Sequence, residues 1–226
     1  MSDEQPYHIE IQPDGPYLVK GKPPLTRRAV VRSEHDEPMT WRTTARLDTG
    51  ETYALCRCGG SSNKPFCDGT HLTNGFDGTE SAPVDNYDER ATTYVGHRVV
   101  VRDDRAICEH AGFCGNRVSN VWKMVGGPAI EDSVVRAQMM AMIERCPSGA
   151  LSYRMEADQD DVEPDLPVGI AVTAEGPYFV SGGIEVQRAD GAAFETRNRV
   201  TLCRCGASSN KPLCDGSHKK VGIVDR

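Results

Sequence analysis

The sequence has few of the residues that build a large apolar core or cross a membrane. Only 38% of its 226 residues are hydrophobic and 6% are aromatic. No apolar run approaches the length of about 20 residues that a membrane-spanning helix needs. The first residues, MSDEQPYHIE, lack the basic and apolar stretches of a secretory signal. We therefore expect a cytoplasmic protein that does not enter a membrane.

The sequence also has fewer basic than acidic residues. Lysine and arginine number 26 against 33 acidic residues, which gives a formal net charge of -7. Proteins that bind nucleic acids usually carry a basic stripe that neutralises phosphates, and no such stripe is present. The sequence also lacks a phosphate-binding loop and a recognisable nucleophile with its base. We expect no nucleic-acid partner and no enzymatic activity.

Cysteine, by contrast, is abundant, with nine residues in the chain. An odd number of cysteines cannot all pair within one chain, and cytoplasmic thiols are usually kept reduced. Small domains with modest cores often need a metal or a disulfide to hold them together. The cysteines therefore indicate metal binding rather than a disulfide framework.

Three of the cysteines and one histidine occur in the stretch LCRCGGSSNKPFCDGTH, residues 55–71. Cys56 and Cys58 are two positions apart, so in an extended segment their side chains leave the same face. Cys67 and His71 are four positions apart and share a face on a helical turn. Three thiolates and one imidazole make four ligands, the number that a tetrahedral zinc ion or a 2Fe-2S cluster requires.

The chain repeats this stretch as LCRCGASSNKPLCDGSH, residues 202–218, with Cys203, Cys205, Cys214 and His218 in the same places. The repetition extends upstream, since IQPDGPYLVKGK at residues 11–22 resembles VTAEGPYFVSGG at residues 172–183. The Gly-Pro-Tyr turns lie 161 positions apart and the first cysteines 147 apart, so the first copy contains an insertion of 14 residues. We expect this insertion within residues 32–45.

Both copies follow the pattern C-x-C-x2-S-x3-P-x-C-D-G-[ST]-H, which is similar to the signature of the CDGSH, or mitoNEET-like, iron-sulfur family. The resemblance implies one 2Fe-2S cluster in each copy. In the first, Cys56 and Cys58 would bind one iron, and Cys67 and His71 the other. In the second, the pairs would be Cys203 with Cys205 and Cys214 with His218. The alternative is a protein in which the two motifs bind zinc, and the zinc only stabilises small domains that interact with other proteins.

The ligand set predicts the chemistry of such a cluster. A neutral imidazole in place of an anionic thiolate raises the cluster's reduction potential. Because imidazole protonates near neutral pH, the histidine couples electron uptake to proton uptake and can also release the cluster. Four basic residues beside the motifs would either favour the reduced cluster or only solubilise the surface: Lys64, Lys211, Arg57 and Arg204.

The three remaining cysteines lie between the copies. CEHAGFC, which contains Cys108 and Cys114, and CPSGAL, which begins at Cys146, resemble the corresponding stretches of divergent single-cluster ferredoxins. Alanine occupies the place of a fourth cysteine. Three thiolates suit a 3Fe-4S cluster. The alternatives are a 4Fe-4S cluster with His110 or a non-protein group as the fourth ligand, and three core cysteines without a metal.

These motifs predict an α+β protein in three parts. Two small β-rich CDGSH domains would occupy residues 1–90 and 157–226, and a ferredoxin-like α+β domain residues 91–156. Residues 81–90 and the acidic residues 156–165 resemble solvated connectors. A helix that Asp132 or Ser133 caps should present its methionines to the core and end at Cys146-Pro147. Two copies in one chain suggest an internal pseudo-dimer in a monomeric protein.

At the level of function, the sequence predicts an iron-sulfur protein with up to three clusters that passes single electrons between redox protein partners. The alternative is a cluster store, a donor to apo-protein acceptors or a redox sensor, which would use the labile histidine-ligated clusters.

Overall fold

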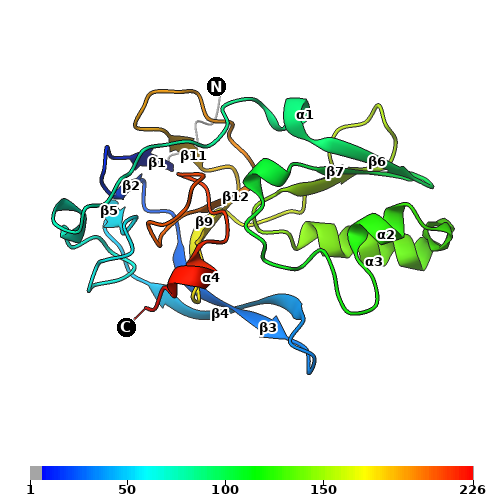
Figure 1. The fold of residues 1–226 in the computed structure, drawn as a ribbon, viewed down its shortest axis with the longest axis horizontal. Helices are drawn as coiled ribbons and strands as arrows, with labels where there is room; N and C mark the ends of the chain where they lie inside the picture. The colour runs from blue at the N-terminus through cyan, green and yellow to red at the C-terminus, as the bar shows by residue number, and fades with distance from the viewer. Residues whose placement is uncertain (1–6, 226) are drawn as a thin grey trace.

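The computed structural model describes residues 7–225, in which three β-sheets are joined by long loops and a few short helices (Figure 1). The predicted α+β class is confirmed. The strands are β1 (His8–Ile11), β2 (Tyr17–Lys20), β3 (Leu25–Arg32), β4 (Pro38–Leu47), β5 (Thr52–Leu55), β6 (Thr92–Gly96), β7 (Val99–Asp103), β8 (Leu151–Arg154), β9 (Gly169–Thr173), β10 (Tyr178–Ser181), β11 (Glu185–Gln187) and β12 (Arg199–Leu202). The helices are η1 (Thr70–Leu72), α1 (Tyr87–Arg90), η2 (Arg105–Ile107), α2 (Val121–Val125), η3 (Pro128–Glu131), α3 (Ser133–Glu144) and α4 (His218–Val221).

Two of the sheets are built jointly by the two copies of the repeat. The first sheet has the order β11-β1-β2-β5, in which the N-terminal copy supplies β1, β2 and β5. Strand β11 comes from the C-terminal copy and lies parallel to β1, with Ile9 opposite Val186. The second sheet has the order β12-β10-β9-β3-β4, and here β3 of the N-terminal copy lies parallel to β9, with Leu25 opposite Ile170.

The exchange of strands is reciprocal. In each copy the strand after the Gly-Pro-Tyr hairpin leaves its own sheet and joins the other, β3 in the first copy and β11 in the second. The boundaries at residues 1–90, 91–156 and 157–226 stay a prediction about the sequence. In space the first and third segments share both sheets and one core.

The centre of that core is a pair of tyrosines, one from each Gly-Pro-Tyr turn. Tyr17 and Tyr178 are completely or almost completely buried, and their rings meet edge to face with centroids 5.9 Å apart. Ile9, Val19 and Val180 pack in the same cluster. Burial of this apolar surface, contributed by both copies, stabilises the shared arrangement.

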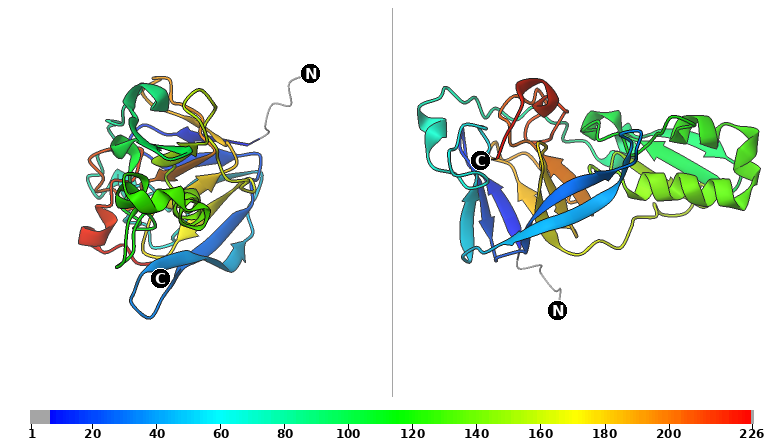
Figure 2. Two further views of the ribbon diagram at one scale, coloured as in Figure 1. Left: turned by 90° about the vertical axis from the view of Figure 1, so that its right-hand side faces the viewer. Right: turned by 90° about the horizontal axis from the view of Figure 1, so that it is seen from below.

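The inserted residues of the first copy form part of a long hairpin of β3 and β4, which we call the arm. It extends from the shared sheets toward the middle segment (Figure 2). There the Arg145 guanidinium donates to the Met39 carbonyl at 2.6 Å, and Trp41 packs on Phe113 with ring centroids 5.2 Å apart. The insertion therefore connects the N-terminal copy to the middle segment.

The middle segment has a sheet and a core of its own. Strands β6, β7 and β8 form the third sheet, and α2 and α3 pack against it. The Asp132 side chain caps α3 by accepting from the Val134 amide at 2.7 Å, as predicted. Met139 and Met142 are buried, which confirms that the methionines belong to the core. The helix ends at Glu144, just before Cys146-Pro147.

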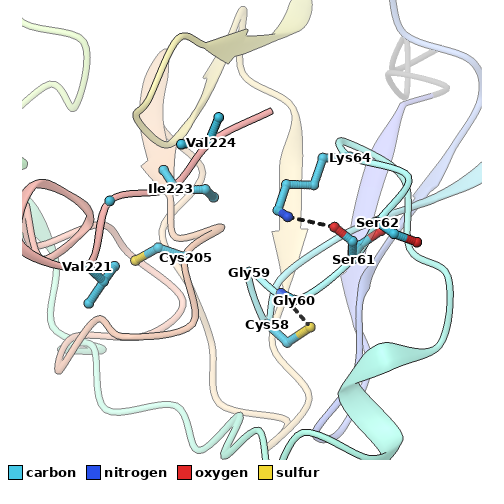
Figure 3. A pocket seen from close by; sticks show the side chains of 11 residues that line it. Cys58, Gly59, Gly60, Ser61, Ser62, Lys64, Cys205, Val221, Ile223 and Val224 are labelled. Carbon is cyan, nitrogen blue, oxygen red and sulfur yellow. Dashed lines mark hydrogen bonds between the residues drawn. The ribbon is translucent and has the colours of Figure 1, made fainter. Parts of the chain in front are cut away.

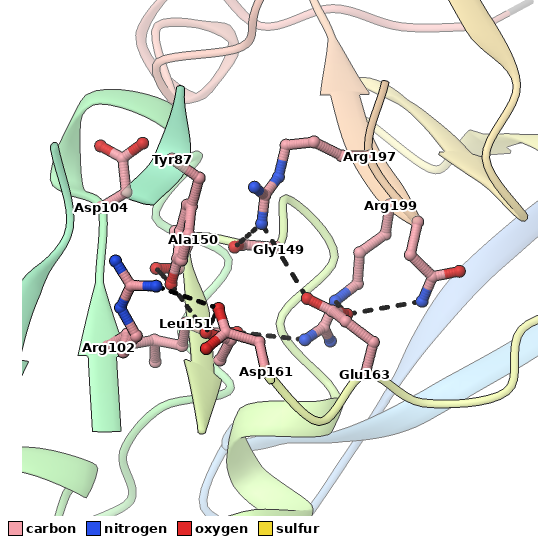
Figure 4. Close-up of polar contacts among 12 residues, drawn as sticks. Tyr87, Arg102, Asp104, Gly149, Ala150, Leu151, Asp161, Glu163, Arg197 and Arg199 are labelled. Atoms are coloured by element: carbon pink, nitrogen blue, oxygen red, sulfur yellow. Dashed lines mark hydrogen bonds and ion pairs between the residues drawn. The ribbon is translucent and has the colours of Figure 1, made fainter. Parts of the chain in front are cut away.

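The two stretches predicted as solvated connectors are mostly exposed, as predicted, but each is held to the fold by a few packed or paired residues. From residues 156–165, the Glu163 carboxylate pairs with the buried Arg199 at 2.9 Å (Figure 4), and Asp161 pairs with Arg154. From residues 81–90, Tyr87 is buried and Arg197 lies 4.0 Å from its ring centroid. Both connectors are therefore largely solvated and are anchored at single positions by arginine contacts.

Within residues 7–225, no helix combines the length and apolar character that a bilayer crossing demands.

Candidate metal centres

The N-terminal site consists of Cys56, Cys58, Cys67 and His71, and the backbone folds its two ligand pairs onto each other. Cys56 directly follows β5. Its amide donates to the Pro65 carbonyl at 2.8 Å, and the Cys67 amide donates to the Ala54 carbonyl at 2.9 Å. The loop between the pairs thus returns alongside the strand end, as the proline-containing sequence predicted.

Within each pair the ligand atoms are close. The sulfurs of Cys56 and Cys58 are 3.9 Å apart, and the Cys67 sulfur lies 3.4 Å from His71 Nδ1. The expected helical turn is short, because η1 begins only at Thr70 and ends at Leu72. It still brings Cys67 and His71 together on one side.

The C-terminal site, with Cys203, Cys205, Cys214 and His218, repeats this geometry. The sulfurs of Cys203 and Cys205 are 3.7 Å apart, and the Cys214 sulfur lies 3.2 Å from His218 Nδ1. The Cys203 amide donates to the Pro212 carbonyl at 2.8 Å. In both sites Nδ1 is the imidazole atom that faces the thiol.

The ligands of each site form two pairs rather than one tight group of four. Among residues 7–225, no three His, Cys, Asp or Glu side chains converge closely enough for a single metal ion. A tetrahedral zinc site needs all four ligands around one point. A binuclear cluster needs two ligands at each of two irons, and this paired arrangement fits that requirement.

A similar arrangement of hydrogen bonds shapes the loop of each of the two motifs. The Asp68 carboxylate accepts from the Ser62 amide and hydroxyl at 2.8 Å and from the Thr70 hydroxyl at 2.7 Å. These hydrogen bonds, that of Thr70 first, hold the pKa of Asp68 well below its usual range. Asp215 likewise accepts from the Ser209 amide and hydroxyl, and its third donor is the Ser217 amide. These hydrogen bonds connect the start of each loop to the Asp-Gly segment beside the second ligand pair.

The glycine after each Cys-x-Cys pair is required by the contact between the two motifs. Cys58 and Cys205 form an antiparallel bridge across the interface of the copies. Gly59 has a φ of +74°, and a Cβ there would lie 2.5 Å from the Cys205 carbonyl oxygen. Gly206 has the mirror-image contact with Cys58. Any larger residue would separate the two motifs.

The arginines beside the sites are structural, so the hypothesis of solubilising surface charge was wrong for them. Arg57 is 1% exposed and Arg204 is 2% exposed. The Arg57 guanidinium donates to the Gly78 carbonyl at 2.6 Å, and that of Arg204 donates to the Gly176 carbonyl at 2.5 Å. Lys64 and Lys211 each donate to a serine carbonyl of their own loop.

Sequence reasoning missed the contribution of the two core tyrosines to the sites. The Tyr17 hydroxyl donates to the Cys203 carbonyl at 2.7 Å, and the Tyr178 hydroxyl donates to the Cys56 carbonyl at 2.9 Å. Each copy thus fixes the first ligand of the other copy. The repeated Gly-Pro-Tyr turn was the signal for this pair, but the sequence does not say what the hydroxyl contacts.

The middle site brings the remaining three cysteines together. Cys108, Cys114 and Cys146 line one cavity of about 150 Å³. His110 lines the same cavity, and its Nδ1 lies 4.0 Å from the Cys108 sulfur. The His110 backbone has a positive φ of 61°, which turns the loop back toward Cys108. All three predicted thiols, and the predicted alternative ligand, therefore face one space.

Hydrogen-bond donors surround the sulfurs in all three sites. The His110 amide lies 3.4 Å from the Cys108 sulfur, and the Arg105 guanidinium lies 3.5 Å from it. In the outer sites the amides of Gly60 and Gly216 approach Cys58 and Cys214 in the same way. Such donors stabilise negative charge on ligating sulfur and raise a cluster's potential.

The sites contain thiols with shifted pKa values in both directions: the hydrogen bond with Cys205 lowers the pKa of Cys203 to about 6, whereas burial makes others harder to ionise. Burial raises the pKa of Cys114 to about 11 and also raises the pKa of Cys108 and Cys214. Metal binding requires thiolates, so iron must displace these protons, and binding weakens as the pH falls. Burial, followed by the nearby charges of Lys219 and Arg204, lowers the pKa of His218 and keeps its imidazole neutral, the form that binds metals.

Another residue that sequence reasoning missed is Glu109. It follows Cys108 in the chain, is 4% exposed, and borders a cavity that His218 also borders. Burial raises the pKa of its carboxyl to about 7. Glu109 thus lies between the middle and C-terminal sites, although nothing in the local sequence indicates that these sites are neighbours.

A cavity lies between the two outer sites (Figure 3). Its volume is about 620 Å³, and its walls include Cys58 and Cys205 from the two motifs. The segment from Val221 to Val224 faces the Cys58 loop across this space. The Arg204 side chain pairs with Asp225 and fixes the end of that segment.

Comparisons with known proteins agree with these three sites. A family model described as "Iron-binding zinc finger CDGSH type" matches residues 14–72 and 175–219. A second model, described as "Divergent 4Fe-4S mono-cluster", matches residues 94–156. Two curated relatives, both named "Uncharacterized protein YjdI" and from the K12 and O157:H7 strains of Escherichia coli, are 37% identical over 62 residues. The aligned part covers 27% of this chain and 82% of each relative. No solved structure matches.

The family matches coincide with the ligand sets. The two CDGSH matches contain the N-terminal and C-terminal sites, and the mono-cluster match contains the middle site. The chain therefore belongs to the iron-binding CDGSH family and is an iron-sulfur protein in which two CDGSH regions flank a divergent mono-cluster region.

Proposed function

We propose that the protein carries single electrons between redox protein partners, with a 2Fe-2S cluster in each outer site and a 3Fe-4S cluster in the middle site. An iron-sulfur cluster, when bound, accepts and returns one electron with little movement of its ligands. The observation that carries the proposal is the pairing of ligands in the outer sites, two sulfurs at 3.7 to 3.9 Å and a sulfur with an imidazole nitrogen at 3.2 to 3.4 Å.

The surroundings of the ligands favour electron transfer over catalysis. Backbone amides point at the sulfurs, and rigid loops hold the pairs, so the ligands need not rearrange when the charge changes. The nine cysteines are all unpaired thiols, which suits a reducing compartment such as the cytoplasm. We propose that the protein is not an enzyme and that it functions as a monomer.

The middle site admits one alternative cluster. Its three cysteines suit a 3Fe-4S cluster, in which the iron without a cysteine is absent. The alternative is a 4Fe-4S cluster with His110 or a non-protein group at the fourth iron, which the position of His110 in the same cavity and the description of the matched family support. Electron paramagnetic resonance of the oxidised protein separates them, since an oxidised 3Fe-4S cluster is paramagnetic and an oxidised 4Fe-4S cluster is silent.

A second candidate function is cluster storage and donation. The histidine ligand favours it, because a protonated imidazole releases its iron and weakens the cluster site. Incubating the coloured protein with an apo-ferredoxin, and separately with a reductase and its reductant, tests both functions. Rapid reversible bleaching without loss of iron supports the electron carrier. Transfer of colour to the apo-ferredoxin supports the donor.

A further inference from the structure

The two outer sites have nearly the same sequence, but the chain surrounds them differently. At the C-terminal site Cys214 is 2% exposed and His218 is 8% exposed. At the N-terminal site their counterparts, Cys67 and His71, are both partly exposed. The difference does not come from the motifs themselves, so it must come from what packs against them.

The loop that follows Cys108 covers the C-terminal site. A Cβ built on Gly216 would lie 3.1 Å from the Glu109 carbonyl oxygen and 3.4 Å from the His110 ring. The equivalent glycine of the N-terminal motif is Gly69, and a Cβ built there would meet nothing within 4 Å. The same turn is thus packed against the middle segment in one copy and open in the other.

Two side chains, one within the C-terminal motif and one directly after it, hold this contact by hydrogen bonds. The Asn210 amide donates to the Ala106 carbonyl at 2.6 Å, and the Lys219 ammonium donates to the His110 carbonyl. Their counterparts in the N-terminal motif, Asn63 and Leu72, are exposed, and Leu72 keeps 80% of its surface accessible. Both fastening contacts are therefore specific to the C-terminal site.

The arm supports the loop that covers the C-terminal site. Trp41 packs on Phe113 of the covering loop and on Phe179 of β10, with ring centroids 5.2 and 6.1 Å away. The remaining exposed edge of His218 borders a cavity of about 440 Å³, and Trp41 and Glu109 are among its walls. The insertion of the first copy thus helps to enclose the metal site of the second copy.

From these contacts we propose that the outer sites have different roles: the N-terminal site is the exchangeable site, and the C-terminal site is closed by the middle segment and retains its cluster. The inference rests on the proposed function, because it requires a cluster in both sites. It adds that protein partners and reagents from solution reach the outer clusters through Cys67 and His71. The middle segment then serves as a cover as well as a cluster site.

Removal of the outer clusters by EDTA measures this difference. EDTA takes up both ferric ions of a cluster, and the two sulfides leave as hydrogen sulfide after each accepts two protons from water. The three cysteine thiolates also regain protons, and no electron is transferred. We expect two phases of equal amplitude, with the C-terminal cluster lost at least about tenfold more slowly, because a covered site must first open locally.

The loss is followed by visible absorbance and by the resonance signal of reduced 2Fe-2S clusters in samples of the full-length protein taken at intervals. Lys219→Ala and Asn210→Ala, which release the covering loop, should accelerate the slow phase. The matched variants Leu72→Ala and Asn63→Ala should change neither phase. Cys67→Ser, which removes a ligand from the open site, should abolish the fast phase only.

Each outcome bears on one claim. A colourless protein, or one without 2Fe-2S signals, would refute the proposed function itself. Normal clusters that are lost at one common rate, or a slow phase unaffected by Lys219→Ala and Asn210→Ala, would overturn the inference and leave the proposed function standing. Circular dichroism of each variant establishes that the fold is retained, and if Cys67→Ser does not fold, the two covering-loop variants still decide the assignment.

Discussion

At the scale of single residues, the grouping of the candidate ligands could be predicted from the sequence, but the contacts that hold them in place could not. The spacing of the cysteines and histidines determines which atoms can meet, and the structure places Cys67 beside His71 and Cys214 beside His218. The roles of Tyr17 and Arg204 depend on contacts across more than a hundred residues or deep in the core. Sequence spacing carries no information about such contacts.

Arg204 provides the first prediction at this scale. Its guanidinium is buried and satisfied by the carbonyls of Gly176 and Thr173 and by the Asp225 carboxylate. Arg204→Met leaves these acceptors without a donor, so the free energy of unfolding should fall by about 3 kcal/mol or more. The exposed Arg98→Met is the matched control and should have almost no effect. Urea unfolding measures both, and equal midpoints would contradict the structural role of Arg204.

The histidine ligands provide the second. Replacing the imidazole of His71 by a thiolate adds negative charge at one iron, so His71→Cys should lower the potential of one cluster. The pH dependence of that potential, expected to approach about 59 mV per unit for a step coupled to one proton, should become flatter. Redox titrations followed by visible absorbance at several pH values test this. The exposed His97→Ala should leave all potentials unchanged, and the same result for His71→Cys would argue against ligation by His71.

At the scale of secondary-structure elements, local patterns predicted the helix from residue 133 and its cap. They did not predict which strands β3 and β11 pair with. A strand with alternating side chains can pair equally well with the hairpin of its own copy or with the hairpin of the other copy. Residues 32–45, where the insertion was expected, lie in the hairpin of β3 and β4. Its role as an arm depends on the aromatic contact with Phe113, which lies in another segment.

The arm gives the prediction at this scale. Trp41→Ala removes the packing on Phe113 and Phe179, and each aromatic pair contributes about 1 kcal/mol beyond its buried area. We expect amide hydrogens in residues 108–117 to exchange faster, because the loop loses its support. Met39→Ala, on the same hairpin with a half-exposed side chain, is the control. Hydrogen-exchange mass spectrometry that finds equal protection in both variants would show that the arm does not support the loop.

At the scale of the whole molecule, the duplication in the sequence indicated a pair of related units, and the structure shows that neither completes a sheet alone. The first sheet needs β11 and the second needs β3. The closure of the C-terminal site by the middle segment also appears only at this scale, since it depends on how three segments are arranged. The two motifs differ too little in sequence to reveal it.

The strand exchange predicts how an isolated copy should behave. Residues 1–90 alone would leave β1 without β11 and β3 without β9. A second molecule can supply the missing strand, since β3 and β11 occupy equivalent places in the repeat. We therefore expect residues 1–90 to form a dimer when they fold, while the full chain stays monomeric. Light scattering with size-exclusion chromatography tests both, and a stable folded monomer of residues 1–90 would contradict the exchange.

The central claim is that the paired ligands of the outer sites hold binuclear iron clusters and not zinc. Mössbauer spectroscopy of the oxidised, iron-57-labelled full chain tests it most directly. Our account predicts two ferric environments of equal area from the outer sites, because one iron of each pair has two thiolates and the other has a thiolate and an imidazole. A colourless protein that retains zinc, or outer-site irons with one uniform all-thiolate environment, would contradict it.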